Sequence, residues 1–408
     1  MPIDLRVDAA RLQRRLDELA GIGALPQGGV CRLAFSPEDK RGRDYVEARM
    51  LALGLAVRID RIGNILGVRA GRAEDPLVLA GSHVDTVGSA GCLDGSLGVL
   101  GALEAIETLN DADVTTRRPI GVIAFANEEG ARFVPDMMGS LVFCGRLRVD
   151  QARRQRDREG VSVGEAIDRT GYGGTDDLRN VAVGAYLELH IEQGPILERA
   201  GATIGVVDRV QGLTWITFTL SGATAHAGAT PIDMRQDAGY VAAAIVQFAR
   251  TLSRDIEGQR ATVGSLSLLP NIVNVVAGHA TVVVDLRNPD AHRLAAAEAR
   301  LHEFVASVAG AERVTVSFAT DVRVAPVSFD PGMVACVKEA ADTLGYSCMP
   351  MMSGAGHDAQ ILAATCPAAM IFVPSRGGIS HNVTEFTSTG DLAAGANVLL
   401  HALLSLSR

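Results

Sequence analysis

Histidine and carboxylate side chains recur just after apolar runs of this sequence, in places where they could bind a metal ion. His83 and Asp85 follow the apolar run 77–80, and Asp94 stands in a glycine-rich stretch. Imidazole nitrogen and carboxylate oxygen together suit a borderline divalent cation such as zinc. Asp85 is placed to accept a hydrogen bond from the second ring nitrogen of His83 and so to fix its tautomer. Alone, this pattern is more typical of a polar surface loop, so a metal site depends on further donors elsewhere.

Further donors of the same kind occur along the chain. Each follows the end of an expected strand or sits in a short polar loop after an apolar run. Together the candidates are His83, Asp94, Glu128, Glu129, His190 and His381. The chain has nine histidines, and three of them stand at such places, which favours one common site over isolated structural histidines.

The adjacent Glu128 and Glu129 need a particular local structure. In a continuing strand they would point to opposite faces, so we expect the strand 120–126 to end at Asn127 and both side chains to turn toward one site. Two carboxylates held together repel each other, and a cation relieves that repulsion. One glutamate can then ligate while the other stays free as a base. Two metals about 3.5–4 Å apart, bridged by a carboxylate, would activate a water by lowering its pKa to about 7.

The composition is that of a packed globular protein. Of its 408 residues, 48% are hydrophobic and 21% are charged, and the formal net charge is −9. The acidic excess argues against nucleic acid as a partner. Residues 1–16 lack an apolar signal-peptide core, and no run of about 18 apolar residues occurs, so we expect a cytoplasmic protein without a membrane span. The six cysteines form no C-x-x-C pair, which favours reduced thiols.

The elements that must position these residues alternate between helices and strands. Apolar runs predict strands, and amphipathic or alanine-rich segments predict helices, which indicates an α/β protein. The strands are expected near 55–59, 64–68, 77–81, 120–126, 185–191, 348–352 and 368–373. The helices are expected near 8–20, 37–53, 96–109, 331–344, after His357 and at the C-terminus.

The pattern changes near residue 210. Strands at 215–220, 262–268 and 280–287 and helices at 236–254 and 290–309 fit a β-α-β-β-α-β unit with helices on one face of an antiparallel sheet. Residues 145–180 are charged and less regular, and we interpret them as a solvated excursion of helix and loop.

Eight motifs, present in order, identify a family resemblance. They are GSHVDTV, LDGSLGVL, FANEEGARF, LHIEQGP, GATAHAG, PNIVNVV with DLRNPD, SGAGHDAQ and GISHN. The chain resembles the di-metal amidohydrolase superfamily that includes aminoacylases and related exopeptidases. Within it the chain is similar to N-carbamoyl-L-amino-acid hydrolases, allantoate amidohydrolases and β-ureidopropionases. The resemblance covers almost the whole chain.

The resemblance implies a particular domain organisation. A mixed-sheet, three-layer catalytic domain of the di-zinc exopeptidase type would comprise residues 1–210 and 322–408. An inserted ferredoxin-like domain, residues 211–321, would serve as a lid and would form a homodimer.

The resemblance also implies the roles of the site residues. Two divalent metal ions, zinc or else manganese, cobalt or nickel, would be held by His83, Asp94, Glu129, His190 and His381, with Asp94 bridging. Glu128 would be the general base, and Asp85 would orient His83.

Substrate contacts follow from the same resemblance. His226 would reach the neighbouring subunit's site and stabilise the oxyanion, while Asn274 and Arg287 would grip the substrate carboxylate. The ureido pocket would be lined by Gln193, Gly354, Ala355 and Gly356. Plainer interpretations remain open: a sheet-edge ion pair for Arg287, a turn residue for His226 and a turn cap for Asn274. For the neighbouring His357, a structural and a catalytic role are equally open.

These assignments predict metal-dependent hydrolysis of a ureido C–N bond in an N-carbamoyl amino acid or an allantoate-like ureido acid. A metal-bound hydroxide would attack, and ammonia and carbon dioxide would leave. Three alternatives remain: an aminoacylase or dipeptidase acting on ordinary amides, an allantoate amidohydrolase of purine catabolism, and a non-catalytic binding protein with the same fold.

Overall fold

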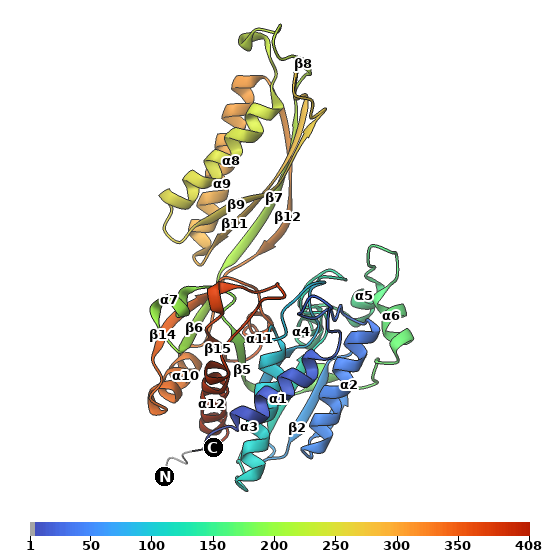
Figure 1. Cartoon of the computed structure of the whole chain (residues 1–408), viewed down its shortest axis with the longest axis vertical. Coiled ribbons are helices and arrows are strands. Elements are labelled where there is room, and N and C mark those ends of the chain that lie inside the picture. Colours follow the sequence, from blue (N-terminus) through green and yellow to red (C-terminus); the bar gives the residue numbers. More distant parts are fainter. Residues whose placement is uncertain (1–4) are drawn as a thin grey trace. The chain divides into compact units, whose positions relative to one another are not determined.

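The computed structural model describes residues 5–408 and divides the chain into two compact units (Figure 1). Unit 1 consists of Met1–Asp208 and Ser328–Arg408, and unit 2 is Arg209–Val327. Residues 1–4, at the start of the segment in which we expect no signal peptide, lie outside the described part.

A nine-stranded mixed sheet forms the middle of unit 1. Its strands follow the order β1-β2-β4-β3-β5-β15-β6-β13, and β14 pairs with β6. Their bounds are β1 (Ala56–Ile59), β2 (Ile65–Arg69), β3 (Leu77–His83), β4 (Ile120–Phe125), β5 (Val183–Ile191), β6 (Ile204–Val210), β13 (Val327–Ser328), β14 (Cys348–Ser353) and β15 (Ala368–Val373). The neighbouring strands β4, β3, β5 and β15 run parallel to one another. Their carboxyl ends therefore meet at one edge of the sheet, where open α/β sheets bind ligands.

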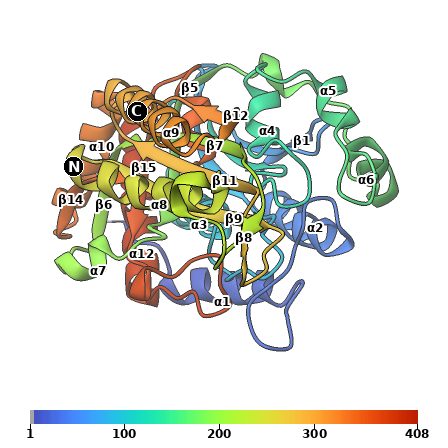
Figure 2. The ribbon, with the colours of Figure 1, turned by 90° about the horizontal axis from the view of Figure 1, so that it is seen from above.

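Helices pack against this sheet in separate hydrophobic clusters. The helices are α1 (Ala9–Ala20), α2 (Pro37–Ala52), α3 (Ser96–Asp111), α4 (Met138–Phe143), α5 (Val149–Arg154), α6 (Val163–Thr170), α7 (Ile196–Ala200), α10 (Pro331–Thr343), α11 (Asp358–Leu362) and α12 (Thr389–Leu406), with 3₁₀ turns at Leu178–Asn180 and Arg376–Gly378. The main cluster contains residues of α1, α2, α3, α10 and α12, whereas α4, α5 and α6 contribute to a smaller one. Both ribbon views show α5 and α6 at one side of the unit, as expected of a solvated excursion (Figures 1 and 2).

Local sequence explains the elements that lead to the site. Every residue of β3 and β4 is buried, and both β4 and residues 77–81 of β3 are apolar without alternation, which is typical of parallel strands covered on both faces. Helix α2 begins as predicted: the Ser36 hydroxyl accepts a hydrogen bond from the amide of Asp39 at 3.1 Å, and Pro37 occupies the first helical position.

Unit 2 is a four-stranded antiparallel sheet with two long helices. Its elements are β7 (Gly212–Ser221), β8 (Ala225–His226), a 3₁₀ turn (Ile232–Met234), α8 (Ala238–Asp255), β9 (Arg260–Leu269), β10 (Val275–Val276), β11 (His279–Asn288), α9 (Ala291–Glu312) and β12 (Thr315–Val324). The strand order β12-β7-β11-β9 completes the expected β-α-β-β-α-β arrangement, and β8 pairs with β10 in a separate ladder. Burial alternates along β11, because one face of the sheet packs on α8 and α9.

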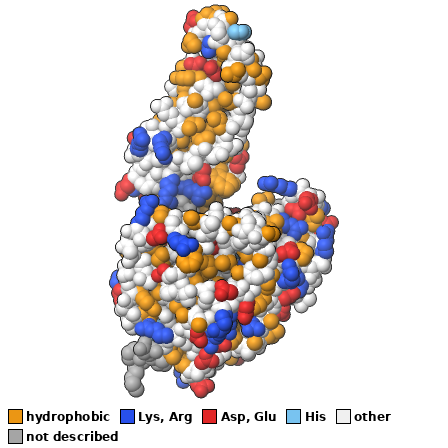
Figure 3. Space-filling model, viewed as in Figure 1, with side chains coloured by type: hydrophobic (Ala, Val, Ile, Leu, Met, Phe, Trp, Pro, Cys, Tyr) orange, Lys and Arg blue, Asp and Glu red, His pale blue; other side chains and the backbone are white. Residues whose placement is uncertain are grey.

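Large hydrophobic side chains are exposed on unit 2. Figure 3 shows hydrophobic atoms on the surface of this unit, and the exposed residues include Trp215, Tyr240, Leu266, Val273 and Phe318.

Helix α12 is the one helix of the described residues that is long and apolar enough to cross a membrane. In the structure 61% of it is buried. Its residues Leu392, Val398 and Leu403 belong to the main hydrophobic cluster of unit 1, as expected of a core helix.

Candidate metal centre

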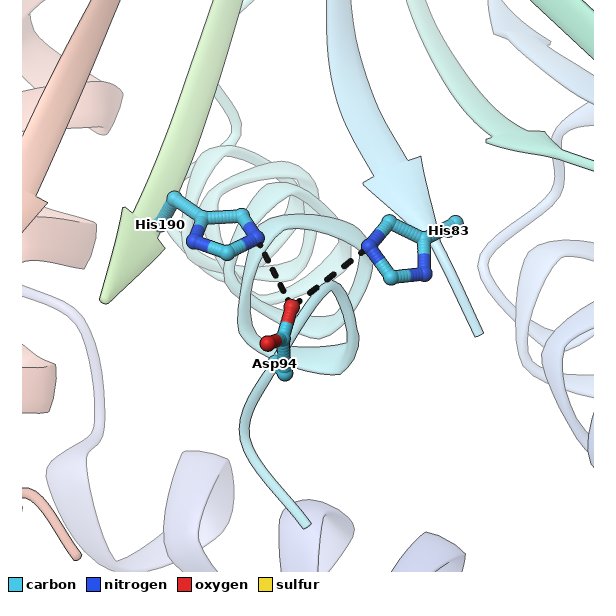
Figure 4. Close-up of side chains that lie close together, drawn as sticks. All are labelled: His83, Asp94 and His190. Carbon is cyan, nitrogen blue, oxygen red and sulfur yellow. Dashed lines mark ion pairs between the residues drawn. The ribbon is translucent and has the colours of Figure 1, made fainter. Parts of the chain in front are cut away.

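The ends of β3 and β5 bring His83 and His190 toward Asp94, which lies in the turn before α3 (Figure 4). Asp94 Oδ1 lies 3.2 Å from His190 Nε2 and 3.6 Å from His83 Nε2. All three side chains are buried, and their donor atoms lie within 4.8 Å of one another. This group could therefore hold a metal ion.

A second group of donors shares Asp94 with the first. His381 Nε2 lies 3.3 Å from Asp94 Oδ2 and 3.3 Å from Glu129 Oε2. The His381 side chain is 48% exposed, whereas Glu129 is 6% exposed. The two carboxylate oxygens of Asp94 thus face different groups, as a bridging ligand would require.

Main-chain carbonyls fix the two buried histidine rings. Nδ1 of His83 lies 3.0 Å from the Asp85 carbonyl oxygen, and Nδ1 of His190 lies 2.9 Å from that of Ile191. Each Nδ1 donates to its carbonyl, which leaves the Nε2 lone pair directed toward Asp94. The amide of Gly95 also donates to His190 Nε2, at 3.2 Å.

The Asp85 carboxylate makes a different contact from the one predicted. We expected it to accept a hydrogen bond from the His83 ring, but this prediction is wrong, because the main-chain carbonyl of Asp85 takes that place. Instead the carboxylate accepts the amides of Glu128, at 3.2 Å, and Glu129, at 3.3 Å. These amides lie beyond the end of β4, where the sheet no longer supplies acceptors for them. A carboxylate is a strong acceptor for such N–H groups.

The turn after β4 directs both glutamates to the site. β4 ends at Phe125, two residues before the predicted end at Asn127, which has a left-handed φ of 53°. The Asn127 side-chain amide donates to the Phe133 carbonyl at 2.9 Å and so holds the turn. Glu128 Oε2 then lies 3.4 Å from His83 Nε2, while Glu129 faces the second group.

Burial and crowding disturb the carboxyl groups of the site. Burial, with the nearby Asp358 and Glu129 carboxylates, raises the pKa of Glu128 well above its usual value. Burial and Asp94 raise the pKa of Glu129 to about 7. The hydrogen bond to Asp94 raises the pKa of His381 to about 9.

Asp94 and the buried imidazoles shift each other's pKa in opposite directions. Burial alone would raise the pKa of Asp94, but the neighbouring imidazoles of His190, His381 and His83 hold it well below its usual value. Burial alone would lower the pKa of His83, but the Glu128 and Asp94 carboxylates hold it well above. The centre therefore needs positive charge beside its carboxylates.

The residues present fit a divalent cation. Glu129 Oε1 is buried and has no hydrogen-bond partner among the described residues, so it has a lone pair to offer. Each group combines imidazole nitrogen with carboxylate oxygen, the donor set of zinc and neighbouring transition metals.

A third group with metal-binding geometry is accounted for by hydrogen bonds. It consists of Glu188, His190 and His357. The Glu188 carboxylate accepts from the Ser82 hydroxyl at 2.7 Å and from the Ala359 amide at 2.8 Å. The His357 ring packs against that of His190 with centroids 4.6 Å apart, and burial lowers its pKa well below the usual value. Ring packing and hydrogen bonds therefore explain why these three side chains lie close together without an ion. The group helps to hold the His190 ring in place.

Of the predicted ureido-pocket residues of unit 1, Gln193 contacts the centre directly. Gln193 Nε2 donates to Asp94 Oδ2 at 2.7 Å, while Gln193 Oε1 is buried without a partner among the described residues. Gly354, Ala355 and Gly356 form the half-buried loop between β14 and α11.

The remaining predicted residues belong to unit 2. His226 is exposed, and its Nδ1 accepts the amides of Gly228 and Ala229 at 3.1 Å each. Asn274 is also exposed. The Arg287 guanidinium pairs with Asp285 on the same strand, at 2.9 Å.

Sequence reasoning missed several buried groups around the ligands. Glu188 and Glu385 are buried and hydrogen-bond to the centre or its neighbours, although no motif had singled them out; the half-buried Ser380, which lies in the GISHN motif but was given no role, does the same. Glu385 follows His381 by four residues, but only the folded chain shows that it reaches back to Asp94.

Comparison with known proteins shows one family throughout. The profile of peptidase family M20/M25/M40 matches residues 79–405. The chain is 41% identical to an N-carbamoyl-L-amino-acid amidohydrolase of Rhizobium meliloti, over 98% of this chain and 96% of that protein. It is 33% identical to an allantoate amidohydrolase of Bacillus subtilis, over 96% of each. A crystal structure of a hydantoinase/carbamoylase family amidase from Burkholderia multivorans superposes with a TM-score of 0.96, at 42% identity and with 99% of each chain covered. The chain belongs to peptidase family M20/M25/M40.

Proposed function

We propose that this protein hydrolyses the ureido C–N bond of an N-carbamoyl amino acid. Water adds to the ureido carbonyl, the bond to the terminal nitrogen breaks, and ammonia leaves. The remaining carbamate loses carbon dioxide and releases the amino acid. The observation that carries the proposal is the pair of donor groups sharing Asp94, in a chain 41% identical to a protein of that named activity.

We assign the metal-binding role to five residues of unit 1. His83, Asp94 and His190 would hold one divalent ion, and Asp94, Glu129 and His381 would hold the other. When bound, the metal supplies a Lewis acid that polarises the carbonyl and lowers the pKa of water. A ureido carbonyl needs this help because two flanking nitrogens donate electrons into it.

We assign the general base to Glu128. Its carboxylate is buried beside His83 and is not among the donors of either group that we assign to metal, so it stays available for a proton. It would take a proton from the attacking water and deliver it to the leaving nitrogen. The Asp85 carboxylate holds the Glu128 amide and so keeps the base in place.

Substrate binding would use residues of both units. Arg287 and Asn274 would bind the substrate carboxylate, and His226 would stabilise the oxyanion in the site of a neighbouring subunit. Gln193 would face the ureido group, because its buried Oε1 has no partner among the described residues and can accept an N–H. The loop of Gly354, Ala355 and Gly356 would line the same pocket.

We further propose a cytoplasmic homodimer. Residues 211–321 would act as lid and dimerisation domain, and residues 1–210 and 322–408 as the catalytic domain. The exposed hydrophobic side chains of unit 2, among them Leu266 and Phe318, support an interface there. Light scattering after gel filtration would measure the mass directly, and a monomer would exclude the assigned role of His226.

Ammonia release tests the proposed activity. Purified protein would be loaded with manganese, cobalt, nickel or zinc and given N-carbamoyl-L-amino acids, N-carbamoyl-β-alanine, allantoate and N-acetyl amino acids. We expect ammonia from at least one ureido acid and none without metal. Turnover of N-acetyl substrates alone would make the protein an aminoacylase. Tight binding without turnover of any substrate would make it a binding protein.

A further inference from the structure

Glu385 connects the two loops that supply Asp94 and His381. Its Oε1 accepts the amide of Leu93 at 2.9 Å and that of Asp94 at 3.3 Å, across nearly three hundred residues of sequence. Its own amide donates to the Asn382 carbonyl at 3.0 Å, within the loop that carries His381.

Ser380 extends the same connection to the Asp94 side chain. Its hydroxyl lies 2.9 Å from Asp94 Oδ2 and 2.9 Å from Glu385 Oε2. Asp94 is therefore held at its main chain by Glu385 and at its carboxylate by Ser380. Both residues flank His381, so one short segment, residues 380–385, carries His381 and also holds Asp94.

The space around the Glu385 carboxylate is closed. Glu385 is 7% exposed. A Cβ atom at Gly91 would lie 2.2 Å from Glu385 Oε1, so only glycine leaves room for the carboxylate to reach the Leu93 and Asp94 amides. The contact between Glu385 and these amides thus depends on the close packing of the two loops at Gly91.

We propose that Glu385 is a positioning residue that sets the distance between Asp94 and His381 and thereby the affinity of the second donor group for its ion. The inference rests on the proposed function. The first group shares Asp94 with the second, but it depends less on Glu385 because its other two donors, His83 and His190, are fixed by carbonyls at the ends of β3 and β5. His381 instead lies in a loop, with a left-handed φ of 52° and a half-exposed side chain.

Cobalt titration of the whole chain tests this inference. The visible absorption of Co²⁺, with calorimetry, would follow binding to metal-free wild type, E385A, E385Q and S380A. We expect two binding steps in wild type. Loss of a group that holds metal ligands costs about 10–100-fold in metal affinity, so E385A should weaken the second step by that factor and leave the first within about 3-fold. S380A should weaken the second step less, since the main-chain contacts remain.

Two comparisons separate positioning from general loss of structure. In E385Q, the amide oxygen can still accept both main-chain N–H groups, so binding should return to within about 3-fold of wild type. Glu192 is a matched control, because it is also 7% exposed and accepts two amides, those of Ile196 and Leu197. E192A should lower the melting temperature as E385A does without weakening the second step.

The outcomes distinguish this inference from the proposed function. Wild type that binds no metal would overturn the proposed function and the inference together. Wild type with two steps and E385A with both steps unchanged would overturn the inference alone. Equal weakening of both steps by E385A, or equal loss in E192A, would also overturn it.

Discussion

At the scale of single residues, the turn after β4 separates Glu129, which we propose as a metal ligand, from its neighbour Glu128. The left-handed Asn127 ends the strand, and the Asp85 carboxylate holds both glutamate amides, so the two side chains reach different donors. His83 lies near Glu128, and His381 near Glu129. This arrangement would leave one carboxylate to bind metal and the other to take a proton, as we propose.

Replacing Glu128 by glutamine tests that separation. The amide keeps the shape of the side chain but cannot take a proton, so turnover should fall about 10²–10⁴-fold while metal content stays that of wild type. Steady-state ammonia release and metal analysis of the same preparation would measure both. Loss of metal would identify Glu128 as a ligand, and an unchanged rate would remove its role as base.

Metal affinity should depend on pH because the metal competes with protons for the same donors. The raised pKa of His381, about 9, means that this ring carries a proton below pH 9 that the metal must displace. Below pH 7 the Glu129 carboxyl, with a pKa of about 7, must also lose its proton. Affinity for the second group should therefore fall about 10-fold per pH unit from pH 9 to 7, and more steeply below. Cobalt titrations at fixed ionic strength would measure the slope, and a flat profile would contradict it.

Residue types and order predicted which side chains gather, but not all their contacts. All five predicted ligands meet in two groups, since each follows a strand end or an apolar run. The partner of the His83 ring was predicted incorrectly, because a main-chain carbonyl competes equally well with the Asp85 carboxylate for that N–H. Glu385 was missed because its role depends on a contact between distant loops.

At the scale of elements, a buried ion pair anchors α2 to the strand that leads to the site. Arg43 Nε lies 3.0 Å from both carboxylate oxygens of Asp39, and both side chains are almost fully buried. The Arg43 guanidinium also donates to the carbonyls of Gly63, at 2.7 Å, and Phe125, at 3.3 Å. Phe125 ends β4, so this pair joins α2 to the strand that leads to the glutamates.

Breaking this pair should destabilise unit 1. R43M would leave the Asp39 carboxylate buried without its cation, which costs about 3–5 kcal/mol in the free energy of unfolding. The double variant D39N/R43M should lose less than the sum of the single variants, because neither charge is then left alone. Urea unfolding followed by circular dichroism would measure all three. Additive losses would show that the two side chains do not act as a pair.

The sequence predicted strands well where every residue of the strand is buried. The apolar runs at 77–81 and 120–126 correspond to β3 and β4, whose every residue is buried. The strand β12 of unit 2 was not located, because its residues are mostly exposed and lack a clear apolar face. The pairing order of the strands had no local signal and was not predicted.

At the scale of the whole molecule, unit 2 is inserted between two neighbouring strands of unit 1. The chain leaves in β6 and returns in β13, which are adjacent in the sheet, and the amide of Phe329 donates to the Asp208 carbonyl at 2.9 Å. All five candidate ligands belong to unit 1. The residues of the candidate metal centre and those of the inserted unit therefore belong to separate segments of the chain.

Replacing Arg209–Val327 by a short Gly-Ser linker tests this separation. Because the ends to be joined are already side by side, unit 1 should fold and bind cobalt in two steps as the full chain does. Hydrolysis should be lost, since Asn274, Arg287 and His226 are removed. Circular dichroism, cobalt titration and ammonia release would measure these results. A folded linker variant without metal would show that the inserted unit contributes to the centre.

Asp94 is shared by donors from early and late parts of the sequence, and this has a consequence for biosynthesis. His83, Asp94, Glu129 and His190 leave the ribosome long before His381, which comes only a short distance before the final helix α12. A nascent polypeptide that has passed His190, or one ended by a premature stop codon between His190 and His381, therefore has four of the five candidate donors and lacks the segment that holds Asp94. Messages truncated there would yield no active hydrolase.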